Sequence, residues 1–224
     1  MSVRVEVVRV FTDSTGRFGN ELGLAQATEV AEADRQGLAA KAGYSETVFL
    51  GAPHDGVAPV RVFTPAVELP FAGHPTVGTA WWFAQQGTPV QALDVPAGRV
   101  AVAYADALTW VTARAAWAPD FTFHQVADVA ELAALRPEKF AAGQHYFWTW
   151  VEEHRGSVRS RMFAPAMGIA EDEATGAAAV ALTARLGRGL TITQGAGSQI
   201  FTEWDSDGWV RLGGRVVPET VVEL

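Results

Sequence analysis

The chain of 224 residues carries 17 basic and 25 acidic residues, a formal net charge of −8, and 49% of its residues are hydrophobic. This composition predicts a well-buried core, and the acidic balance without a run of Lys and Arg argues against nucleic acid and anionic membranes as partners. The chain contains no cysteine, which excludes disulfides, thiolate metal sites and thiol-based catalysis.

Alternating apolar residues predict a first strand over residues 3–11, followed by a loop over residues 12–20 that is rich in Asp, Ser, Gly and Asn. A signal peptide would begin instead with a basic segment and an unbroken apolar stretch. The sequence also lacks the run of about 18 apolar residues that a membrane span requires. We therefore expect a cytoplasmic protein without a membrane partner.

Helix-like and strand-like segments then alternate irregularly. Apolar residues at helical spacing predict helices over residues 25–42, 75–86, 126–135 and 174–186. Short apolar or alternating segments predict strands over residues 47–50, 60–64, 90–104 (two strands), 108–113, 145–151, 158–163, 191–194, 198–203, 209–212 and 216–222. Because strands outnumber the unevenly spaced helices, the pattern favours an α+β fold over a doubly wound sheet.

A four-residue string recurs within the chain. Phe-Thr-Pro-Ala at 63–66 returns as Phe-Ala-Pro-Ala at 163–166, and in both copies a strand precedes the string. About ten residues later a helix of small residues begins, at 73–76 in the first copy and at 173–176 in the second. This matching context predicts two duplicated halves.

Duplication would bring two equivalent helix starts toward one shared cleft. Each start offers unpaired N–H groups and a positive dipole end, which suit a carboxylate or an oxyanion. Polar side chains accompany both starts, and two glycines would let a ligand approach the backbone closely: His74, Asp172, Thr175, Gly73 and Gly176.

Taken singly, these residues have simpler interpretations. Asp172 alone is typical of a helix N-cap, and His74 alone is typical of a hydrogen-bonded loop histidine. Glu46, which precedes an apolar strand, would by default be a solvated charge at a strand start. The functional interpretation depends on the three residues acting together.

The longer motifs resemble those of PhzF-like proteins of phenazine biosynthesis. The first-half resemblance lies in Ser-Glu-Thr-Val-Phe-Leu at 45–50 and in the segment 61–80, which includes Pro-Phe-Ala-Gly-His-Pro-Thr-Val-Gly. The second-half resemblance lies in Ser-Arg-Met-Phe-Ala-Pro at 160–165 and Glu-Asp-Glu-Ala-Thr-Gly-Ala-Ala at 171–178. Shorter matches are Gly-Asn at 19–20 and Gln-Gly at 194–195.

This resemblance implies a diaminopimelate epimerase-like fold of two pseudo-symmetric halves, each a curled β-sheet or barrel around a central α-helix. The halves would be residues 1–104 and 105–214, and the strand at 215–224 could join the first half. The resemblance also implies a homodimer that acts on a small molecule, a cyclic amino or hydroxy acid, and uses no cofactor and no metal.

The implied activity is that of an isomerase, which moves a proton between carbons of a small carboxylic acid such as dihydro-hydroxyanthranilate. Glu46 would be the general acid and base, assisted by His74 and Asp172. The substrate would be held by Ser45, Gly73, Thr175, Gly176 and Ala177.

Three features depart from the family pattern. The chain is shorter than usual after residue 104, and Glu21 follows the Gly-Asn pair where the family has proline. Ala177 stands where the family usually has Ser or a similar polar residue, which would remove a hydroxyl contact to the substrate. A non-catalytic binding protein of the same fold is therefore the alternative, and such a protein would tolerate Glu46→Gln. A thiol-dependent racemase is excluded because its two cysteines are absent.

Overall fold

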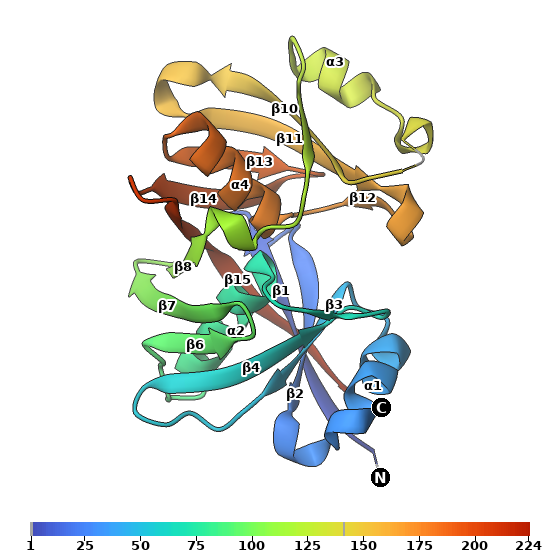
Figure 1. Ribbon diagram of the computed structural model, residues 1–224, viewed down its shortest axis with the longest axis vertical. Coiled ribbons are helices and arrows are strands. Elements are labelled where there is room, and N and C mark those ends of the chain that lie inside the picture. Colours follow the sequence, from blue (N-terminus) through green and yellow to red (C-terminus); the bar gives the residue numbers. More distant parts are fainter. Residues whose placement is uncertain (1, 141) are drawn as a thin grey trace.

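The computed structural model describes residues 2–140 and 142–224, in which one sheet continues through two parts of the molecule (Figure 1). In the first part, β1 pairs with both β2 and β15, so that eight strands close into a barrel. In order around the barrel these strands are β1 (Arg4–Thr12), β2 (Asn20–Gln26), β3 (Glu46–Leu50), β4 (Val57–Phe63), β6 (Ala92–Val95), β7 (Gly98–Ala105), β8 (Leu108–Arg114) and β15 (Trp209–Glu223).

The second part extends the same sheet from β15. Its strands are β14 (Ser198–Trp204), β13 (Leu190–Gln194), β11 (Ser157–Ala164), β10 (His145–Glu152) and β9 (Thr122–Gln125), and β12 (Ile169–Asp172) pairs with β11. Within the described residues, this part ends at β9 as an open, curled sheet. Helix α1 (Arg35–Ala42) and strand β5 (Glu68–Leu69) lie beside β4, and helix α3 (Val129–Ala134) lies beside β10. The described residues also form six short 3-10 helices.

Each part contains one buried helix. Helix α2 (Gly73–Gln85) runs inside the barrel against β1, β8 and β15, and α4 (Gly176–Leu186) packs on β14 and β15. Both helices consist largely of small and apolar residues, as expected for helices that are buried on most sides. A Cβ atom at Gly78 of α2 would lie 2.6 Å from Leu22 Cδ2, so the glycine allows the helix to approach β2 closely.

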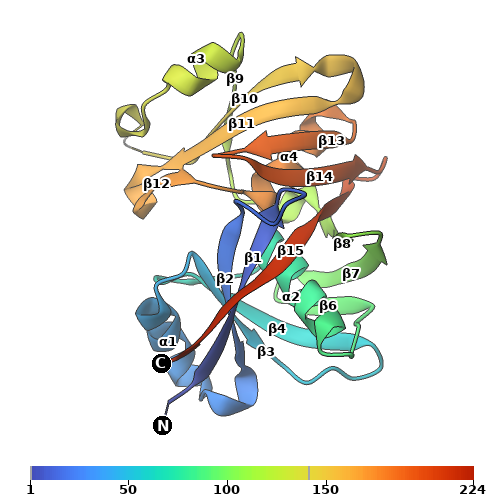
Figure 2. The same cartoon turned by 180° about the vertical axis from the view of Figure 1, so that it is seen from behind.

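Strand β15 joins the two parts physically. It pairs with β14 at one end and with β1 at the other, and Figure 2 shows it in red running diagonally across the molecule. The sequence predicts two strands here, over residues 209–212 and 216–222, but the glycines between them continue the strand. The rings of Trp110 and Phe11 lie against Gly213 and Gly214, where side chains would not fit.

The predicted helix over residues 25–42 is wrong in its first half. Residues 20–26 form β2, and the helix is limited to α1. Ala25 pairs with Val5 of β1 and Phe49 of β3, and residues 27–29 and 32–34 form short 3-10 turns. Pairing in the sheet therefore outweighs the local preference for a helix. The sequence also does not predict β5, β9 and β12.

The two parts share one hydrophobic core, whose buried residues include Val10 and Val77 of the first part and Val158 and Leu182 of the second. The boundary proposed after residue 104 falls at the end of β7, and β7 pairs with β8 in the same barrel. The division into halves therefore stays a prediction. Within the described ranges, none of the helices has the length and apolarity needed to span a membrane.

Candidate active site

The two buried helices start in direct contact, near the middle of the molecule (Figure 1). A Cβ atom at Gly73 would lie 2.8 Å from Gly176 Cα, and one at Gly176 would lie 3.1 Å from the backbone nitrogen of His74. Only glycine allows the backbones to approach so closely. The prediction that the two helix starts meet is therefore confirmed.

Neither helix has a side-chain cap. The residues before the helices, Ala72 and Thr175, make no capping hydrogen bond from their side chains. The first N–H groups of both helices have no partner in the helical ladder, and two positive dipole ends lie side by side. This arrangement is unfavourable by itself and favours the binding of an anion.

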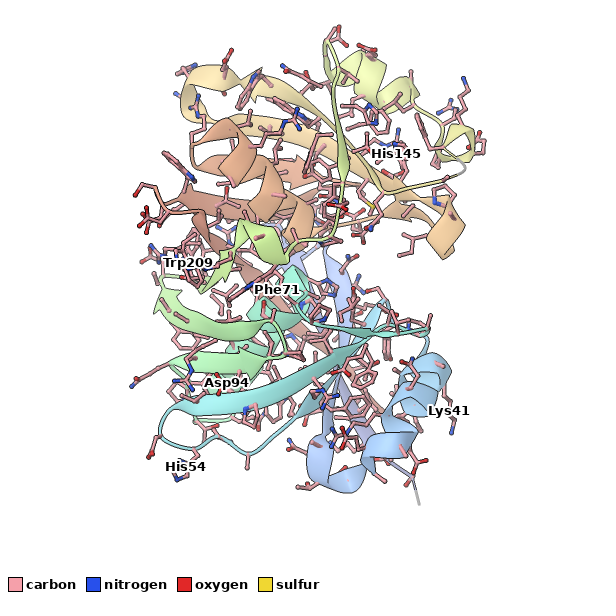
Figure 3. All side chains as sticks on the ribbon, in the orientation of Figure 1. Lys41, His54, Phe71, Asp94, His145 and Trp209 are labelled. Carbon is pink, nitrogen blue, oxygen red and sulfur yellow. The ribbon has the colours of Figure 1, made fainter. Side chains whose placement is uncertain are left out.

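The start of α2 is also held by aromatic packing. Phe71, which lies near the middle of the molecule in Figure 3, is buried and packs on Trp117 with a ring separation of 5.7 Å. Trp117 in turn packs edge-on against Trp209 of β15 at 5.5 Å. These contacts fix the segment that leads into Gly73 and His74.

Glu46 begins β3 and His74 lies in the first turn of α2, and the two side chains meet in the interior. Oε2 of Glu46 is 3.2 Å from Nε2 of His74, and the side chains are only 16% and 6% exposed. Among the described residues neither atom has a hydrogen-bond partner. The interpretation of Glu46 as a solvated charge is therefore wrong.

Burial shifts the pKa values of both groups toward their uncharged forms. Desolvation raises the pKa of Glu46 from 4.5 to about 7, and the hydroxyl of Ser45 partly opposes the shift. Desolvation lowers the pKa of His74 to about 4, against the charge of Asp172 and the backbone of Glu21. Near neutral pH, Glu46 thus exists in both protonation states beside a neutral imidazole.

Asp172 ends β12 and is held by residues from both parts of the fold. Its Oδ1 accepts a hydrogen bond from Asn20 Nδ2 at 2.7 Å, and its Oδ2 accepts one from Thr175 Oγ1 at 2.5 Å. Burial raises the pKa of Asp172, whereas the hydrogen bonds from Thr175 and Asn20 lower it. Thr175 occupies the N-cap position of α4, so the interpretation of Asp172 as that cap is wrong.

The structure brings the sequence-predicted residues into one region. Thr175, Gly176 and Ala177 form the start of α4, and Ala177 is buried. Ser45 is exposed at the edge, with its hydroxyl 3.5 Å from the carbonyl oxygen of Glu21.

Asn20 and Gln194 also belong to this region, although their sequence motifs alone did not assign them a role. Asn20 donates to Asp172 and also to the carbonyl oxygen of Ala174 at 2.9 Å. Gln194 donates to the Asp172 carbonyl oxygen at 3.0 Å and to Thr175 Oγ1 at 2.8 Å. Their place in the Gly-Asn and Gln-Gly matches is the signal that could have identified them.

A separate groove lies outside this site. A groove of about 780 Å³ lies on the first barrel and is lined by residues that include Arg35, Phe49, Arg61 and Asp94, the last of which is labelled in Figure 3. In the ranges 2–140 and 142–224, no group of three or more His, Cys, Asp or Glu side chains could hold a metal ion.

Comparison with known proteins identifies the family of the chain. A family model described as phenazine biosynthesis-like protein matches residues 8–134 and 112–208. The chain is 32% identical over 200 residues to a trans-2,3-dihydro-3-hydroxyanthranilate isomerase of Pseudomonas chlororaphis, and the match covers 72% of each chain.

Solved structures confirm the predicted fold class. A PhzF family protein of Enterococcus faecalis superposes with a TM-score of 0.80 at 20% identity, over 100% of this chain and 99% of that one. A probable proline racemase of Agrobacterium radiobacter superposes with a TM-score of 0.67 at 11% identity, over 99% and 92% of the two chains. These likenesses establish the α+β architecture of the diaminopimelate epimerase type.

Proposed function

The chain belongs to the phenazine biosynthesis-like protein family, and from this premise we propose that it is an isomerase that moves a proton between two carbons of a small carboxylic acid. The contact between the uncapped starts of α2 and α4 carries this proposal. It would provide a rigid anion site within reach of a buried carboxylate whose pKa is close to neutrality. A binding site for a substrate carboxylate and a proton-transfer group would thus lie together.

The substrate carboxylate would occupy the helix starts. The N–H groups of Gly73 and His74 in α2 and of Gly176 and Ala177 in α4 come first in their helices and lack helical partners. An anion there would satisfy these donors and offset the two positive dipole ends. Because the side chain of Ala177 is a methyl group, only its backbone N–H could bind the substrate carboxylate at this position.

Glu46 would carry the proton. As a carboxylate it would take a proton from one substrate carbon, and as a carboxylic acid it would return a proton to another carbon, so that the enzyme ends in its starting state. A group works best in both directions when its pKa is near the working pH, and burial raises the pKa of Glu46 to about 7.

His74 and Asp172 would orient the reacting atoms. The neutral imidazole of His74 would accept a hydrogen bond at Nε2 from the protonated Glu46 or from the substrate, because that nitrogen has no partner among the described residues. Asp172, held by Asn20 and Thr175, would accept hydrogen bonds from a hydroxyl or amino group of the substrate.

The test compares the wild-type protein with Glu46→Gln in D₂O, with trans-2,3-dihydro-3-hydroxyanthranilate as substrate and NMR detection of the ring protons. We expect the wild type to isomerise the substrate with deuterium incorporation. Glu46→Gln should lose on the order of 10³-fold in rate, because the proton-transfer group is gone. Glu29→Gln, the same change at an exposed position, is the matched control.

The outcomes separate the parts of this proposal. Full activity of Glu46→Gln would remove Glu46 from the chemistry. A wild-type protein without activity would contradict this substrate, and a screen of cyclic amino and hydroxy acids for thermal stabilisation would then be the next experiment. A ligand that binds but incorporates no deuterium from D₂O would favour the non-catalytic alternative.

A further inference from the structure

Glu173, the residue after Asp172, binds the turn between β13 and β14. Its Oε2 accepts a hydrogen bond from the Ala196 N–H at 2.8 Å. Its Oε1 accepts from the Ser198 hydroxyl at 2.7 Å and from the Gly197 N–H at 3.3 Å. Three donors therefore converge on one carboxylate, which is the group best suited to accept them all.

The turn fits closely between Glu173 and the first part of the fold. Gly195 has a φ of +57°, and a Cβ atom there would lie 2.7 Å from the carbonyl oxygen of Glu173. A Cβ atom at Gly197 would lie 2.6 Å from the ring of Phe18, which belongs to the loop between β1 and β2. Glycine is thus required on both sides of the turn, which packs closely against Glu173 and Phe18.

Ser198 extends this connection into the first barrel. It is fully buried, and its Oγ accepts a hydrogen bond from the Gly19 N–H at 2.8 Å while its hydroxyl donates to Glu173. Gly19 precedes Asn20, which binds Asp172. The first and second parts are therefore connected twice at this point. Asn20 binds Asp172 directly, and the adjacent Gly19 is connected to Glu173 through Ser198.

We propose that Glu173 is a positioning residue, which fixes Asp172 relative to His74 by holding the β13–β14 turn and, through Ser198, Gly19. The expected effect on the rate rests on the proposed function. The hydrogen bonds of Glu173 and Ser198 do not depend on which substrate the protein uses. Removal of the Glu173 carboxylate would leave Ser198 free to turn away from Gly19. The segments that carry Asn20 and Asp172 would then lose one of the two connections between them.

The test uses Glu173→Gln, with Glu171→Gln as the matched control. Glu171 lies two positions earlier on β12, and its carboxylate pairs with Arg161 and not with the turn. Glu171→Gln therefore removes one negative charge, as Glu173→Gln does, but leaves the turn contacts in place. Glutamine keeps the size of Glu173, but its amide has only one acceptor oxygen for the three donors. We expect kcat to fall on the order of 10-fold in Glu173→Gln with little change in KM, and to stay unchanged in the control.

Two measurements need no substrate. Hydrogen exchange of the Gly19 amide should accelerate on the order of 10-fold in Glu173→Gln, because its partner Ser198 is no longer held. The pKa of His74, followed through its ring ¹⁵N signals, should fall further below its usual range as the charge of Asp172, which raises it, moves away. Unchanged Gly19 exchange and an unchanged His74 titration in folded Glu173→Gln would overturn the proposal, even if kcat fell.

Ser198→Ala provides a second route. It removes the link to Gly19 without changing the charge, and it should reproduce the change in Gly19 exchange if Glu173→Gln fails to fold. In a double-mutant cycle, the effects on kcat should be smaller than additive, because both variants break the same connection. Fully additive effects, or wild-type exchange of Gly19 in Ser198→Ala, would contradict the positioning role.

Discussion

The Glu46 carboxylate and the His74 imidazole lie 3.2 Å apart and buried, yet both favour their uncharged forms. In water such a pair would form a salt bridge. Here burial removes the hydration of each charged form, which raises the pKa of Glu46 and lowers that of His74. The site therefore holds a carboxyl group that can both release and accept a proton near neutral pH.

The rate should depend on pH through Glu46. If its carboxylate starts the reaction, kcat/KM should rise with pH and reach half of its limiting value near pH 7, where the pKa of Glu46 lies. Ser45→Ala should move this midpoint upward by several tenths of a unit, because the Ser45 hydroxyl lowers the pKa of Glu46. A midpoint near pH 4.5 in the wild type would contradict the assignment.

Glu46 should also reduce the stability of the fold at alkaline pH. Its pKa is raised in the folded state, so the favourable effect of its neutral form is complete below pH 4.5 and is lost as the pH rises through 7. At pH 8, Glu46→Gln should therefore be more stable than the wild type, by up to about 3 kcal/mol. Urea unfolding at pH 4.5 and pH 8 measures this difference, and an equal effect at both pH values would count against it.

His74→Asn should lower kcat/KM on the order of 100-fold, because the neutral ring nitrogen that faces Glu46 is lost. The loss should be present across the pH range in which the enzyme is active, since the pKa of His74, about 4, lies below it. Steady-state kinetics, with thermal unfolding as the control for folding, would test this prediction. Unchanged kinetics would remove His74 from the site.

Gly73→Ala should prevent the two helix starts from meeting. The new methyl group would lie 2.8 Å from Gly176 Cα, and backbone cannot move as cheaply as a flexible side chain. We expect a loss of stability of several kcal/mol, or no folding at all. Gly37→Ala on the exposed face of α1, where nothing lies within 4 Å of the added Cβ, should instead leave stability unchanged or raise it by up to about 1 kcal/mol.

The relationship to the family leads us to expect a homodimer. Sedimentation equilibrium at micromolar concentration should give twice the monomer mass of 23.9 kDa. A single species at the monomer mass over the whole concentration range would contradict this expectation.

The sequence by itself determined the features that local pattern controls. Helical spacing identified α2 and α4 within a few residues, and the repeated string at 63–66 and 163–166 predicted that their starts face each other. Alternation identified most strands. His74 and Asp172 followed from the repeated helix starts, whereas the role of Glu46 followed from the resemblance of its short motif to the family.

Only the tertiary structure decided the features that depend on distant partners. Residues 20–26 have no strong local preference for a strand, and they become β2 because β1 and β3 lie on either side of them. Glu173 does not differ from a surface glutamate until the β13–β14 turn folds against it. The same holds for the pKa of Glu46, because desolvation depends on which atoms replace water, and those atoms come from parts of the chain that only folding brings together.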